Sequence, residues 1–139
     1  DLACEFFAVF SRFEFALKDA GFLYVNRNGR AAPDWNAFAD KATLQAPPGS
    51  ELEKAITFLN REPPQVQVSP RQWQPAALRG TAPVATAIDS AQRVRNNLFH
   101  GGKHTPHSVP GRDEALVRAA LTVLLACVAQ NPQVGAAYC

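Results

Sequence analysis

The sequence lacks paired cysteines, and this absence excludes a secreted scaffold held together by disulfides. Its three cysteines, Cys4, Cys127 and Cys139, are an odd number, and no C-x-x-C pair occurs. Small secreted domains that depend on disulfides usually carry an even number of cysteines. We therefore expect a reducing compartment, the cytoplasm. We also expect Cys127, in the apolar run Leu124–Val128, to be a small core residue.

Long apolar runs and a strong net charge are missing as well. No run approaches the ~20 residues that a helix needs to cross a bilayer. No segment combines a basic start, a short apolar core and a small-residue cleavage site, so none is typical of a signal peptide. We expect no membrane association. The net charge of +2 is far from the basic balance of proteins that coat nucleic acid, so any such contact should be local.

Signatures of several enzyme classes are also absent. The sequence contains no P-loop, no G-x-S-x-G and no G-x-G-x-x-G, and no recognisable motif assembles a Ser-His-acid triad. These absences disfavour P-loop nucleotide hydrolases, α/β-hydrolases and dinucleotide-binding enzymes. Strand patterns are scarce too, because Val66–Val68 is the only candidate and is too short for more than an edge strand.

Apolar residues recur instead at helical spacing, which predicts an all-α fold. The sequence S-E-L-E at Ser50–Glu53 is a capping box that marks one helix start. The periodicity and the stop signals predict five helices, at residues 2–20, 34–44, 50–61, 84–99 and 112–129. We expect a single domain over residues 1–139, built as a small bundle of about five helices.

Residues 62–83 interrupt this helical pattern. Five prolines fall in this stretch, and no long helix or central strand tolerates that density. A structureless loop of this length is unusual inside a compact domain. The sequence therefore predicts an ordered loop here, anchored by Trp73.

The most informative segment is R-V-R-N-N-L-F-H-G-G at residues 93–102, where a predicted helix meets two glycines. Arg95 lies about 40° from Ala91 and about 20° from Ile88 around that helix, within its apolar stripe. Asn96 and His100 are four apart and share one edge. Arg binds anionic oxygens as a rigid fork, and His moves protons near neutral pH. A plain helix end, with a capping glycine and a dipole-compatible histidine, is the alternative interpretation.

Glu14 is a second candidate, because it falls within the apolar arc of the first helix. It lies about 40° from Phe10 and about 20° from Phe7. A carboxylate in that position needs a partner, since burying it alone is costly. Arg95 is the partner that would join Glu14 to a site, whereas Arg12 points to the far side of its own helix. A purely structural pair is the alternative to a role in the site.

The three histidines, His100, His104 and His107, have nearly the spacing of a zinc site on a helix. Two glycines and a proline interrupt the pattern, however, and no cysteine or carboxylate lies close by before Asp113. We therefore predict no metal and no other cofactor. The histidines could instead gather around a phosphate.

The segment Arg95-Asn-Asn-Leu-Phe-His100 resembles the defining motif of the HEPN superfamily, the higher eukaryotes and prokaryotes nucleotide-binding domains. That motif is an Arg, four to six residues and a His, with a polar residue, often Asn, directly after the Arg. The family places it at the end of a long helix in a small all-α domain. The resemblance covers the helical frame of most of this chain, while residues 62–83 have no motif to support it.

This resemblance implies a metal-independent endoribonuclease of the toxin or phage-defence type, with RNA as its partner. The ribose 2′-hydroxyl would attack the adjacent phosphorus and leave a cyclic phosphate. The resemblance assigns proton movement to His100, stabilisation of phosphoryl charge to Arg95 and orientation to Asn96. We add Lys103 and His104 as candidate phosphate contacts because they follow the glycines directly, and Glu14 as a further residue of the substrate site.

The family also implies a homodimer, with the motif helices of two subunits facing each other across a two-fold axis. Phe15 and Phe22 are candidates for apolar dimer surface, with a place in the core as the alternative. A toxin of this family is expected to have an antitoxin protein as a partner. There are two competing hypotheses. One is a non-catalytic nucleotide- or RNA-binding regulatory domain, and the other is a metal-dependent hydrolase that uses the histidines.

Overall fold

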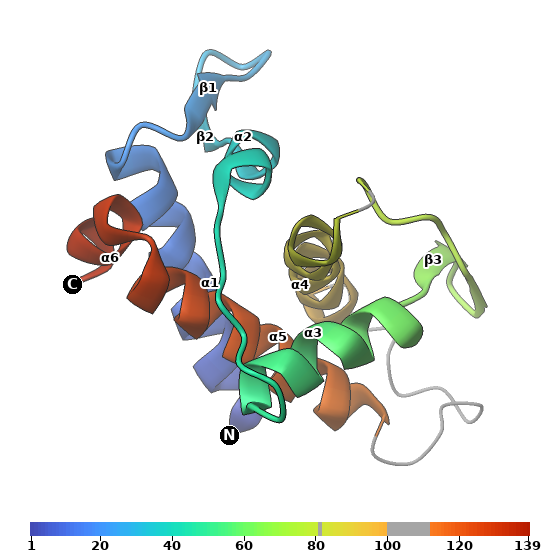
Figure 1. Ribbon diagram of the computed structural model, residues 1–139. Coiled ribbons are helices and arrows are strands. Elements are labelled where there is room, and N and C mark those ends of the chain that lie inside the picture. Colours follow the sequence, from blue (N-terminus) through green and yellow to red (C-terminus); the bar gives the residue numbers. More distant parts are fainter. Residues whose placement is uncertain (81, 100–111) are drawn as a thin grey trace.

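The computed structural model describes residues 1–80, 82–99 and 112–139. Over these residues the chain is mostly helical and packs as a small helical bundle with two short hairpins (Figure 1). The helices are α1 (Leu2–Asp19), α2 (Trp35–Lys41), α3 (Glu51–Arg61), α4 (Pro83–Phe99), α5 (Arg112–Gln130) and α6 (Pro132–Tyr138). The strands are β1 (Leu23–Val25), β2 (Ala31–Pro33), β3 (Val66–Ser69) and β4 (Gln72–Gln74).

The five predicted helices are confirmed, and side-chain caps explain where two of them begin. The Asp34 carboxylate accepts the backbone N–H of Ala37 at 3.0 Å at the start of α2. At the start of α3, Ser50 Oγ accepts the N–H of Glu53 at 3.1 Å. Such caps satisfy N–H groups that the first helical turn leaves without a partner. Helix α2 ends at Lys41, earlier than predicted, because the next residue is extended.

The predicted series of helices, the last at residues 112–129, missed a sixth helix. Helix α5 does end at Gln130, but Pro132 occupies the first turn of α6, where its missing N–H costs nothing. The two helices meet at an angle of 105°. Helix α6 then packs against α1 as well as α5. Arg12 secures this packing, because its guanidinium donates to the carbonyl oxygens of Tyr138 and Cys139.

The hairpins were mostly missed as well. The prediction of Val66–Val68 as a strand is confirmed by β3, but β1, β2 and β4 went unrecognised. Strands β1 and β2 pair antiparallel on either side of a turn, and so do β3 and β4. The first turn is fixed by Asn26, whose Oδ1 accepts the N–H of Asn28 and of Arg30. Gly29 in that turn has a φ of +74°, a conformation that favours glycine.

Helix α5 lies at the centre of the core. It packs against α1, α3, α4 and α6, and its buried side chains belong to the same apolar cluster as those of the other helices. Several core side chains have essentially no exposed area: Phe6, Phe13, Leu59, Ile88, Val123, Leu124 and Cys127. Among the described helices, no single one is long and apolar enough to cross a bilayer. The bent pair of α5 and α6 reaches that length and composition only together.

The prediction that Cys127 is a core residue is confirmed, and it leads to a prediction about thiol chemistry. Burial raises the pKa of Cys127 to about 12, whereas Cys4 and Cys139 are exposed. Because the thiolate is the reactive form, two thiols should react quickly with Ellman's reagent in the native protein. Cys127 should react only on unfolding, even near about pH 10. Three thiols reacting at one rate in native buffer would contradict this.

Gly135 in α6 should be indispensable for the contact between α5 and α6. A Cβ at this position would lie 2.5 Å from the Val128 backbone oxygen, so one of the two helices would have to move. Gly135→Ala should therefore lower the free energy of unfolding by about 1–3 kcal/mol, measured by urea denaturation. The exposed neighbour Ala136→Ser is the matched control, with an effect of about 0.5 kcal/mol or less. An increase in stability, as alanine ordinarily gives in helices, would refute the close approach.

Candidate functional site

The side chain of Trp35, the first residue of α2, lies against α1. Its rings stack on those of Phe10 and Phe13, with centroids 5.0 and 5.2 Å away. Its indole Nε1 donates to Glu14 Oε2 at 2.8 Å. This bond explains how Glu14 is accommodated among apolar residues, because a half-buried carboxylate is stable when a donor reaches it. Trp35 therefore provides the hydrogen-bonding partner for which the sequence suggested Arg95.

Arg95 contacts the same Phe10 ring. Its Cζ atom is 5.6 Å from the centroid of the Phe10 ring, within the range of a cation–π contact. The side chain is half-buried and contacts the core residue Phe10, so Arg95 rises from the face of α4 that meets α1, as the helical projection predicts. Its Nη1 also donates to Oδ1 of the exposed Asn96 at 3.3 Å. Arg95 and Asn96 thus form one polar pair in the last turns of α4.

Glu14 and Arg95 are joined through two aromatic rings. The carboxylate holds the indole of Trp35, the indole stacks on Phe10, and the guanidinium of Arg95 lies over that same ring. The two charged candidates therefore belong to one cluster of α1, α2 and α4. Arg12 is excluded from it, as predicted, because it reaches the C-terminal residues on the far side of α1.

Arg93 has a different role, which the sequence interpretation missed. Its guanidinium donates to three backbone carbonyl oxygens of the proline-rich stretch: Pro64 at 2.9 Å, Ala76 at 2.8 Å and Ala77 at 3.0 Å. Carbonyls in such a stretch need outside donors because prolines supply no N–H. Arg93 therefore fixes the ends of the β3–β4 hairpin to α4.

Asn97 assists Arg93, since its Nδ2 donates to the carbonyl oxygen of Gln65 at 2.8 Å. A helical projection could have shown that these two residues lie on a different face of α4 from Arg95. Arg93 and Asn97 are four residues apart and share an edge, whereas Arg93 and Arg95 lie about 200° apart. The prediction of a loop anchored by Trp73 was incomplete, because Arg93 and Asn97 on α4 donate hydrogen bonds to the described part of this stretch. Trp73 is half-buried, and its indole Nε1 finds no hydrogen-bond partner in the described structure.

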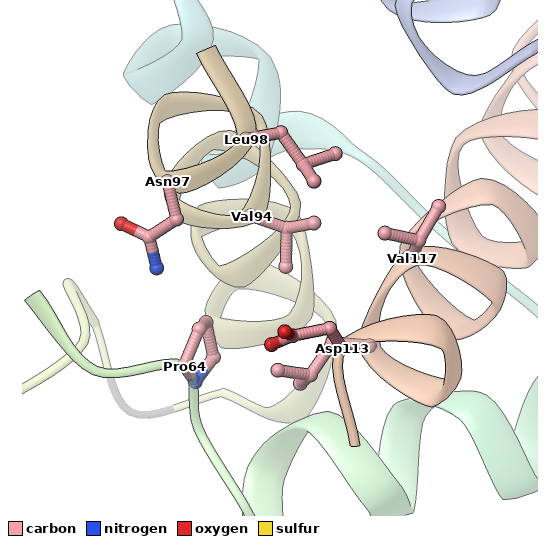
Figure 2. Close-up of a pocket in the computed structure, with 7 residues that line it drawn as sticks. Pro64, Val94, Asn97, Leu98, Asp113 and Val117 are labelled. Atoms are coloured by element: carbon pink, nitrogen blue, oxygen red, sulfur yellow. The ribbon is translucent and has the colours of Figure 1, made fainter. Parts of the chain in front are cut away.

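A hollow lies between the end of α4 and the start of α5 (Figure 2). It is about half open and comprises about 250 Å³ of space, a figure that includes open solvent. The residues that line it are Pro64, Val94, Asn97, Leu98, Asp113, Leu116 and Val117. The Asn97 amide already donates to Gln65, and among the described residues of the lining the only charged group is the Asp113 carboxylate. These described residues offer no cation to a phosphate.

Four of the predicted residues cannot be placed, because His100, Lys103, His104 and His107 fall outside the described ranges. Helix α4 is described as far as Phe99, so His100 is the residue that follows directly in the chain. Among the described residues, no group of three His, Cys, Asp or Glu could hold a metal ion. The part of the candidate site that is described consists of Glu14, Arg95 and Asn96.

The two aromatic residues considered for a dimer surface differ in their surroundings. Phe15 is 58% exposed. Phe22 is half-buried and meets Phe38 edge to face, with centroids 5.4 Å apart. Phe22 therefore belongs to the aromatic cluster beside Trp35, while Phe15 leaves an apolar ring on the outer face of α1.

Comparisons of this chain with family models, curated proteins and solved structures gave no match.

Loss of the Arg93 side chain should loosen the proline-rich stretch. Arg93→Ala leaves three carbonyl oxygens without their donor, so the free energy of unfolding should fall by about 2–3 kcal/mol. Amide hydrogen exchange over residues 64–77 should become faster. Arg71→Ala, at an exposed arginine of the same hairpin, should change stability by about 0.5 kcal/mol at most. Unchanged stability and exchange in Arg93→Ala would rule out the proposed anchoring.

Proposed function

We propose that this chain is a HEPN-like, metal-independent endoribonuclease with a site built on Arg95, Asn96 and His100. The observation that carries the proposal is the position of Arg95. A half-buried guanidinium lies over Phe10 and is bonded to Asn96 in the last turns of α4, immediately before His100 in the chain. A merely capped helix end requires no such arrangement.

The chemistry suits Arg95. A cation packed against an aromatic face loses part of its hydration and is held in one orientation. A guanidinium held in this way costs little to reorganise when charge develops on a phosphoryl oxygen. The Glu14 carboxylate lies at the other end of the same aromatic cluster. There its role would be to hold Trp35, and through Trp35 the ring beneath Arg95, so we place Glu14 as a positioning residue.

The reaction would be a transesterification within the RNA. The ribose 2′-oxygen attacks the adjacent phosphorus, a base takes the 2′-hydroxyl proton, and the 5′-oxygen leaves with a proton from an acid. The products are a 2′,3′-cyclic phosphate and a 5′-hydroxyl. His100 would move one of these protons, Asn96 would orient His100 or the phosphate, and Lys103 and His104 would bind neighbouring phosphates.

A two-fold dimer would complete the site. Two copies of the Arg95 pair facing each other would concentrate positive charge that the net charge of +2 does not suggest. The exposed ring of Phe15 is available as part of such an interface. The proposal includes a cytoplasmic location, consistent with three free cysteines, and an antitoxin protein as a partner of a toxin of this kind.

Cleavage of single-stranded RNA in the presence of EDTA tests the proposal. The wild type should cleave, His100→Ala should lose about 10²–10⁴-fold in rate, and Arg95→Gln about 10²–10³-fold. Arg95→Lys should recover only part of the loss, because it keeps the charge but not the fork. Arg118→Gln is the matched control, since this exposed arginine pairs with Glu114 on α5.

Two outcomes would contradict the proposal. One is an inactive wild type that binds RNA or nucleotides in a thermal-shift measurement, which would favour the non-catalytic binding domain. The other is activity that EDTA abolishes and a divalent metal restores, which would favour the metal-dependent hydrolase.

A further inference from the structure

The β1–β2 hairpin projects from the helical bundle beyond the ends of α1 and α2 (Figure 1). Its base is closed by a hydrogen bond from the Asp34 N–H to the Phe22 carbonyl oxygen at 2.8 Å. Its turn is held by the two bonds that Asn26 Oδ1 accepts. The hairpin is therefore ordered at both ends, although little of it is covered by the bundle.

All three side chains of β1 are exposed, which is unusual for apolar residues. Leu23 is 43% exposed, Tyr24 53% and Val25 70%. Tyr24 and Val25 face small partners across the hairpin, since Tyr24 pairs with Ala32 and Val25 with Ala31. The residue paired with Tyr24 is therefore too small to cover its ring. Grouped exposed apolar side chains usually mark an interaction site.

The same hairpin carries positive charge without compensation. Residues 20–33 contain Arg27 and Arg30 and no carboxylate. Both arginines are exposed, and within the described residues neither side chain has an ion pair or a hydrogen bond. The N–H of Asn26 donates to the carbonyl oxygen of Arg30 at 2.9 Å, which extends the strand pairing by one residue. Strand alternation then places Arg30 on the same face as Tyr24.

We propose that this hairpin binds single-stranded RNA, with Tyr24 stacking on a base and Arg27 and Arg30 contacting phosphates. The proposal deepens and rests on the endoribonuclease function, because it names the surface that holds the substrate. An exposed aromatic ring beside uncompensated cations is the combination that binds single strands without sequence readout. Phosphates would supply negative charge to pair with Arg27 and Arg30, and a base would stack on the exposed ring of Tyr24.

The hairpin is connected to the candidate site by short, ordered segments. Strand β2 ends at Pro33, Asp34 caps α2, and Trp35 stacks on Phe10, the ring on which Arg95 lies. Along α1, the nine residue steps from Phe10 to Asp19 rise about 14 Å, and β1 begins four residues further on. A strand held on the hairpin would therefore have to bridge a distance of at least this order to reach Arg95.

A protein partner fits the hairpin less well than RNA does. A standard protein interface uses about 20–30 residues on each side, and this projection offers three apolar side chains and two arginines. The charge also matters, because the cores of protein interfaces are depleted of unpaired charged groups.

Binding of a short fluorescein-labelled 2′-O-methyl oligoribonucleotide, followed by anisotropy, tests the proposal. This probe lacks the attacking hydroxyl, so binding is measured apart from cleavage. Tyr24→Ala should weaken binding by about 5- to 150-fold, while Tyr24→Phe should retain it. The double variant Arg27→Gln/Arg30→Gln should reduce the slope of log K against log salt by about 1.4, or about 0.7 for each phosphate contact. Arg71→Gln, at the exposed arginine of the other hairpin, is the matched control and should match the wild type.

The outcomes separate the hairpin from the catalytic proposal. If the hairpin variants weaken binding but the wild type does not cleave RNA, the RNA-binding role of the hairpin is supported and the proposed nuclease activity is overturned. Cleavage with an unchanged KM in the hairpin variants overturns the hairpin and leaves the nuclease standing. The hairpin proposal is also wrong if the wild type does not bind the probe. It is equally wrong if Tyr24→Ala alters only self-association in size-exclusion chromatography, which would make the hairpin a protein interface.

Discussion

The stacking of Trp35 on Phe10 and Phe13 is the contact on which both candidate functional surfaces depend. It attaches α2 to α1, gives Glu14 its hydrogen bond and supports the ring beneath Arg95. Each aromatic pair contributes about 0.5–1.5 kcal/mol beyond its buried area, and a hydrogen bond to a charged group about 1.5–3 kcal/mol. The β1–β2 hairpin leads directly into this contact, so the same few side chains set the positions of the hairpin and of the polar pair on α4.

Helix α4 divides its polar residues between two tasks. Arg93 and Asn97 donate to carbonyl oxygens of the proline-rich stretch. Arg95 turns to the opposite side, toward α1, with Asn96 beside it. Arg93 and Arg95 thus contact different parts of the protein, because two side chains with one residue between them point in nearly opposite directions from a helix. The proline-rich stretch is consequently held in place without using the side chains assigned to chemistry.

Much of the helical frame could be predicted from the sequence, because long apolar periodicity and caps such as Ser50 are local signals. The position of Arg95 in the apolar stripe followed from the same geometry, and the structure confirms it. Helix α6 was missed because Pro132 serves both as the stop of one helix and as the first turn of the next. Strands β1, β2 and β4 have three residues each, which is too short to show a recognisable alternation of apolar and polar residues.

The errors at the site have a different origin. Glu14 was expected to find a charged partner, but the hydrogen bond that the structure describes comes from Trp35, 21 residues away. The role of Arg93 likewise depends on carbonyls up to 29 residues distant. Contacts of this kind are set by the packing of whole elements, and no short pattern in a single sequence encodes them.

The central claim is that RNA itself supplies the nucleophile, with Arg95 and His100 assisting and no metal ion. Mass analysis of the products formed in EDTA tests this most directly, with matched RNA and 2′-O-methyl RNA as substrates. The account predicts fragments ending in a 2′,3′-cyclic phosphate from the RNA and no cleavage of the methylated strand. Cleavage of the methylated strand, or fragments with a 5′-phosphate and a free 3′-hydroxyl, would contradict it.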